Sequence, residues 1–169
     1  MEEMKSEGMA SHPFNSALET GIRALVVLEA LHPRRCDLTE MTWLDHLVVH
    51  TADIDQDSPP SLHPELPNRA GELLVRRSLV EQSLRLMHQI HLVDIDDTEE
   101  GIVFSASEEA PSFLDLLQAP YTVELKRRAE WLGKRFGAFS TEEIRTVVED
   151  RIGRWTAEFQ PRRDAGEGP

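Results

Sequence analysis

The sequence predicts a mainly α-helical fold with a small β-hairpin, arranged as a winged-helix-like core of helices and hairpin followed by C-terminal helices. Three observations lead to this fold class. Apolar residues recur at spacings of three and four along several segments, as in amphipathic helices. Between residues 91 and 105 this spacing gives way to two short runs rich in Val, Ile and Phe around an acidic turn. Two capping boxes, each a serine followed three residues later by a glutamate, mark helix starts.

The first two helices are predicted on either side of a turn at residues 33–37. Ser16 with Glu19 opens the first helix, whose apolar residues spread around much of its circumference until Pro33 ends it. We therefore expect this helix to be largely buried. A second helix is predicted over residues 38–50, where the spacing of three and four returns.

A long loop and a third helix follow. Residues 51–68 contain three aspartates and four prolines, which neither a helix nor a strand interior tolerates. Loops of this length are uncommon in compact domains and are often functional. From residue 69 a longer helix is predicted, with apolar residues along one face: Leu73, Leu74, Leu79, Val80, Leu84, Met87 and Ile90.

The hairpin and the C-terminal helices complete the predicted elements. Residues 91–95 and 102–105 are predicted as strands and residues 96–101 as their turn, and three helices followed by a hairpin is the order of a winged helix. A short helix capped by Ser107 and a longer one beginning near Pro120 come next. Ser140 and Glu143 open the final helix, whose apolar stripe ends with Trp155 and Phe159.

These elements predict one domain between two tails. Residues 1–12 are predicted to be a disordered N-terminal tail, because they alternate acidic and small polar residues. Residues 13–159 form a single winged-helix-like domain with a C-terminal helical extension. Residues 160–169, polar and rich in glycine and proline, are predicted to be a disordered C-terminal tail.

Composition restricts the location and the partners. The chain of 169 residues has one cysteine, Cys36, no apolar run long enough to cross a membrane and no secretory signal, so we expect a soluble, cytoplasmic protein. Its formal net charge of -13 disfavours free-standing binding to nucleic acid, which depends on Lys and Arg neutralising phosphates. Acidic charge maintains solubility, and a basic partner is a further possibility.

One group of residues has the composition of a metal site. His46 and His50 share a helix face, and Asp53 and His63 follow in the loop. Asp45 precedes His46, however, and no glutamate stands where a His-Glu-x-x-His helix has its general base. The chain also lacks a glycine-rich phosphate loop and a nucleophile elbow. We expect no metal, no cofactor and no enzymatic activity, and a metal-dependent enzyme is the last-ranked alternative.

Arginines on the predicted third helix are the best indication of nucleic-acid contact, because in a winged helix this would be the recognition helix. Against this, the hairpin turn is acidic and Glu72 can pair with Arg76 four residues along the helix, which would give the arginines an ordinary surface role. A winged-helix DNA-binding transcription regulator is thus the second hypothesis. The arginines are Arg69, Arg76, Arg77 and Arg85.

Several short runs resemble one protein family over roughly residues 13–159. They are PFNSALE at 13–19, LDHLVVHT at 44–51, SLHP at 61–64, GELLVRR at 71–77, ASEEA at 106–110 and AEWL at 129–132. These runs are similar to the middle components of bacterial ABC three-component systems. The resemblance implies a winged-helix-type accessory subunit, encoded between an SMC- or RecN-like ATPase and an effector, in anti-phage or anti-plasmid systems that include Lamassu-like defence. The resemblance implies no catalytic residues for this chain.

The first hypothesis is therefore a non-catalytic accessory subunit that docks on the ATPase and couples it to the effector, with DNA contacted only through the complex. We expect docking through the arginine-bearing third helix and the C-terminal stripe, because arginine and aromatic residues dominate many interfaces. The expected partner-binding residues are Arg69, Arg76, Arg77, Trp155 and Phe159.

Overall fold

The computed structural model describes residues 16–64 and 69–157, so both predicted tails lie outside the described residues. The elements are α1 (Ala17–Leu31), β1 (Cys36–Asp37), α2 (Leu38–Val49), the 3-10 turn η1 (Thr51–Asp53), α3 (Arg69–Gln89), β2 (Val93–Thr98), β3 (Gly101–Ala106), α4 (Ala110–Asp115), α5 (Pro120–Phe136) and α6 (Thr141–Ala157). The predicted fold class, mainly helical with a hairpin after the third helix and further helices behind it, is confirmed.

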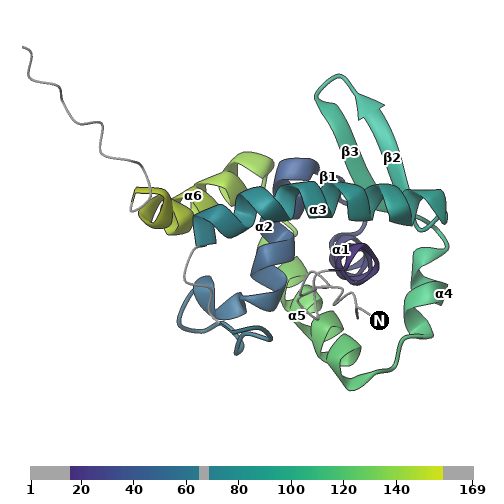
Figure 1. The fold of residues 1–169 in the computed structure, drawn as a ribbon, viewed down its shortest axis with the longest axis horizontal. Coiled ribbons are helices and arrows are strands. Elements are labelled where there is room, and N and C mark those ends of the chain that lie inside the picture. The colour runs from purple at the N-terminus through teal and green to yellow at the C-terminus, as the bar shows by residue number, and fades with distance from the viewer. Residues whose placement is uncertain (1–15, 65–68, 158–169) are drawn as a thin grey trace, which may run out of the picture.

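Helix α1 is the central element, and α2, α3, α4 and α5 all contact it (Figure 1). The Oγ atom of Ser16 accepts from the N–H of Glu19 at 3.1 Å, as the capping box predicts. Two glycines allow close packing of the neighbours. A Cβ atom on Gly21 would lie 2.6 Å from the Cε atom of Met87 in α3, and one on Gly133 in α5 would lie 2.6 Å from the backbone oxygen of Ala30.

A two-residue strand lies within the turn predicted at residues 33–37. Cys36 pairs with Phe104 and Asp37 with Val103, so the sheet has three antiparallel strands in the order β1-β3-β2. The side chain of Asp37 then accepts from the N–H of Glu40 at 2.8 Å and caps α2. A strand of two residues is too short to show an alternating pattern, and the sequence analysis therefore missed it.

The hairpin is longer than predicted. Strands β2 and β3 pair from Val93 with Ala106 to Thr98 with Gly101, which brings acidic residues that we assigned to the turn into β2. The backbone of Gly101 has a φ of 117°, a conformation that favours glycine. Figure 1 shows the hairpin extending beyond the helices. Asp96, Asp97, Glu99 and Glu100 near its tip are exposed.

The described part of the predicted loop folds back onto the end of α2. The N–H groups of Leu62 and His63 both donate to the carbonyl of Val49, at 3.0 and 3.1 Å. The hydroxyl of Thr51 donates to the carbonyl of Pro59 at 2.7 Å. These bonds hold His63 beside the last turn of α2, so the loop adds side chains to the site described below.

Helix α5, and the part of α6 whose side chains the structure describes, bury residues of the apolar stripes that the sequence predicts; in α6 these are Ile144 and Val148. In α5, Leu125, Ala129, Leu132 and Phe136 are buried. The capping box of α6 has both of its bonds: the N–H of Ser140 donates to Glu143 at 2.6 Å, and the N–H of Glu143 donates to the Oγ atom of Ser140 at 3.1 Å. Within the described residues, none of the helices is long and apolar enough to span a membrane.

Candidate functional site

Polar side chains that the sequence places far apart meet inside the helical core. We call this group the buried polar cluster. Helix α1 contributes one arginine, α2 an aspartate and a histidine, α3 a second arginine, and the segment after α2 two histidines and an aspartate. Its buried members are Arg23, Asp45, His46, His50 and Arg76, and its partly buried members are Asp53 and His63.

An ion triad stands at the centre of this cluster. The carboxylate of Asp45, which is fully buried, accepts from Nε of Arg23 at 2.6 Å and from a terminal nitrogen of Arg76 at 2.6 Å. A second nitrogen of Arg23 donates to Asp45 at 3.2 Å and to the hydroxyl of Thr20 at 3.3 Å. Because each arginine comes from a different helix, the single carboxylate of α2 joins α1 to α3.

The triad fixes the charge of Asp45. Burial alone would raise the pKa of this carboxyl, but the guanidinium groups of Arg23 and Arg76 lower the pKa below its ordinary value. Burial also opposes the charge of Arg23, and Asp45 keeps the pKa of Arg23 raised. The three groups are therefore charged together. The buried carboxylate is fully engaged in linking α2 to α1 and α3 through the two buried cations.

The histidines form a row that begins beside the triad. Nε2 of His46 lies 3.1 Å from a carboxylate oxygen of Asp53, and the rings of His46 and His50 are 4.5 Å apart. The ring of His63 meets that of His50 edge-on at 5.9 Å, and Nε2 of His63 shares a hydrogen bond of 2.7 Å with the hydroxyl of Tyr121. The row thus runs from the end of α2 to the start of α5.

All three histidines have lowered pKa values. Burial, followed by the neighbouring His46 and Arg76, lowers the pKa of His50 to about 3. Burial, followed by Arg23 and Arg76, lowers the pKa of His63 to about 4. Burial also lowers the pKa of His46, although Asp53 opposes this shift. The row is neutral at physiological pH, because a proton there would have to enter a buried site beside two arginines.

The residues of the metal alternative do come together, but not as a metal site. Within residues 16–64 and 69–157, no group of three or more His, Cys, Asp or Glu side chains is arranged to hold a metal ion. Asp53 hydrogen-bonds His46, and Tyr121 hydrogen-bonds His63. Nε2 of His46 and Nε2 of His63 are thus already engaged inside the protein.

The expectation for Arg76 requires a correction. We expected this residue on an exposed face, paired with Glu72, but it is 7% exposed and bound to Asp45. It lies on the buried stripe of α3, four residues before Val80 and eight before Leu84, which are both fully buried. Arg76 is therefore not available to a partner in this fold.

The outward face of α3 exposes apolar side chains that the sequence analysis did not place there. Leu74, which we placed on the apolar inner face, is 78% exposed, and Val75 is 72% exposed. Arg77 is also exposed and donates to the hydroxyl of Thr39 at 2.8 Å. The side chains of Arg69 and Trp155, and the whole of Phe159, lie outside the part of the chain that the structure describes. Of the expected partner-binding residues with described side chains, Arg77 alone is exposed.

Sequence reasoning missed two members of the cluster, Arg23 and Asp45. Each had a signal. Arg23 precedes the apolar run 24–28 in a helix expected to be buried, and Asp45 lies between Leu44 and Leu47, which are both buried. Because an unpaired buried charge is very costly, a charge at such a position implies an opposite charge on another element.

Comparison with known proteins identifies the chain. The sequence model of one protein family, described as ABC-three component (ABC-3C) system Middle Component 2, matches residues 13–158. The chain belongs to this family. The match confirms the family resemblance seen in the sequence and makes the protein an accessory component of a system with partner proteins. No curated protein and no solved structure matches the middle component.

Proposed function

We propose that this middle component is a non-catalytic accessory subunit of a bacterial anti-phage or anti-plasmid defence complex, in which it docks on an SMC- or RecN-like ABC ATPase and couples it to an effector. The observation that carries the proposal is the family match over residues 13–158. The buried polar cluster supports it, because its charged groups are engaged in holding α1, α2 and α3 together.

The outward face of α3 is the proposed docking surface for the ATPase. Leu74 and Val75 are exposed, and Leu74 lies three residues before the exposed Arg77, at a neighbouring position on the helix surface. Arginine is among the residues that most often dominate binding energy, and exposed apolar side chains beside it supply area that a partner can bury. Arg69, Trp155 and Phe159 remain proposed contacts of the same kind.

Co-purification tests this proposal. The middle component and the ATPase encoded beside it would be expressed together, and affinity would be measured by titration. We expect Leu74→Asp combined with Arg77→Glu to weaken binding by about thirtyfold or more, which corresponds to about 2 kcal/mol. Arg127→Glu is the control for charge reversal at a surface arginine, because Arg127 is exposed on α5 and pairs only with Glu124 in the described structure. Equal binding by both variants, with unchanged melting temperatures, would refute docking through α3.

One observation favours a second function, direct contact with DNA. The order α1-β1-α2-α3-β2-β3, with β1 beside β3, suits a winged helix whose α3 would enter a groove. The net charge of -13 and the acidic hairpin residues Asp96, Asp97, Glu99 and Glu100 oppose this function. Binding of the isolated chain to duplex DNA at low salt, abolished by Arg77→Glu, would support the alternative over the accessory role.

A further inference from the structure

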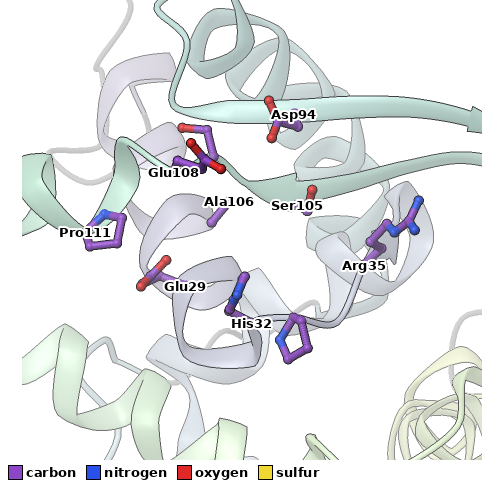
Figure 2. Close-up of a pocket in the computed structure, with 10 residues that line it drawn as sticks. Glu29, His32, Arg35, Asp94, Ser105, Ala106, Glu108 and Pro111 are labelled. Carbon is purple, nitrogen blue, oxygen red and sulfur yellow. The ribbon is translucent and has the colours of Figure 1, made fainter.

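Two adjoining pockets form a groove on a part of the surface that α3 does not line. The first, about 520 Å³, lies between the end of α1, the base of the hairpin and the start of α4. The second, about 350 Å³, continues between α1, α4 and α5, and the two share Glu29 and Pro111. Figure 2 shows Glu29 of α1 and His32, just after α1, on one side of the first pocket, with Asp94 and Ser105 of the strands on the other. We call the pair of pockets the hairpin-base groove.

Negative charge dominates the walls of this groove. Its carboxylate side chains are Glu29, Asp94, Glu108, Asp115 and Glu130. The fixed cations of the lining, Arg35 and Lys126, are already engaged. Arg35 lies 3.5 Å from Asp96, and Lys126 donates to the backbone oxygens of Leu114 and Leu117 at 2.7 and 2.9 Å.

In the described structure, the carboxylates of the groove are not neutralised by other side chains. Across residues 16–64 and 71–150, none of the groove carboxylates takes part in an ion pair or a hydrogen bond. By contrast, Glu81, Glu124 and Asp55 each pair with an arginine. Like charges around one hollow repel one another, and a cation placed among them gains from all of them. The groove is therefore complementary to a positively charged occupant.

The sheet also offers backbone groups to the groove. Strand β1 pairs with β3 only at Phe104 and Val103, whereas β3 continues to Ala106, which lines the groove. The N–H of Ser107 donates to the carbonyl of Leu92 on the side of β2. Since backbone groups alternate between the two sides of a strand, those of Ala106 face away from β2. An extended peptide lying in the groove would meet this short free edge.

We propose that the hairpin-base groove binds an extended, basic segment of a partner protein, whose lysine or arginine side chains enter between α1 and the start of α4. Nucleic acid does not complement this surface, because its negatively charged phosphates would face the carboxylates of Glu29, Asp94 and Glu108. The lining residues come from α1, the strands, α4, α5 and the segments between them and not from α3, so this interaction is separate from the proposed docking of the ATPase.

The test uses a fluorescein-labelled peptide of alternating lysine and serine, about twelve residues long, which spans about 40 Å when extended. Its binding to the full chain would be followed by fluorescence anisotropy. We expect Glu29→Lys with Glu108→Lys to weaken binding about tenfold or more. Glu29 lies in the last turn of α1, where lysine suits the helix dipole, so the fold should persist.

The matched control is Glu99→Lys with Glu100→Lys, which changes the net charge equally at the exposed tip of the hairpin. We expect it to weaken binding by less than about threefold, since charges beyond a Debye length of about 8 Å are screened. A peptide of alternating glutamate and serine should not bind. Equal loss in both double variants, no binding by the wild type, or tighter binding of a single-stranded oligonucleotide would each overturn the proposal.

Discussion

Replacing Asp45 with asparagine tests the central ion triad directly. The substitution preserves the size of the side chain but removes the charge of the carboxylate that Arg23, 2% exposed, and Arg76, 7% exposed, share. Removing one partner from a buried ion pair costs about 3–5 kcal/mol, because the remaining charge is buried without compensation. Here one carboxylate serves two guanidinium groups at 2.6 Å each, so we expect a loss at the upper end of this range.

Such a loss is a large part of the stability of a small domain, about 5–15 kcal/mol. Urea denaturation followed by circular dichroism would measure the free energy of unfolding of the wild type and of Asp45→Asn. Asp57→Asn is the control, because Asp57 is an exposed loop residue and its substitution should change stability by less than about 0.5 kcal/mol. A loss of less than about 1 kcal/mol in Asp45→Asn would show that the triad does not hold the helices.

Two further predictions follow from the same core. Burial lowers the pKa of His50 to about 3 and that of His63 to about 4, from the ordinary value of 6.5. The unfolded chain therefore takes up protons at these histidines before the folded protein does. The folded protein should lose stability as the pH falls from about 6.5 towards 4 and then 3. His50→Gln should flatten this pH dependence in urea titrations, and an unchanged curve would contradict it. Gly133→Ala should lower stability by about 1–3 kcal/mol, since its Cβ atom would overlap the backbone oxygen of Ala30, and a raised melting temperature would show that α5 moves aside freely.

Prediction from the sequence succeeded where structure depends on neighbours along the chain. The capping boxes at Ser16 and Ser140 have the predicted bonds, because a cap involves residues only three positions apart. The buried stripe of α5 and the hairpin after α3 appear where the apolar spacing placed them. The family was also recognisable from short runs of sequence, and the match to residues 13–158 confirms it.

Only the tertiary structure decided the rest. The sequence indicates that Arg76 shares a helix face with Val80 and Leu84, yet an arginine is stable there only because Asp45, 31 residues earlier, lies opposite it on α2. Strand β1 forms because Cys36 pairs with Phe104 of β3. The hairpin-base groove forms where α1, the hairpin and α4 come together. Local spacing determines helices and turns, whereas the pairing of a charge or a strand edge depends on which distant segment the folded chain brings beside it.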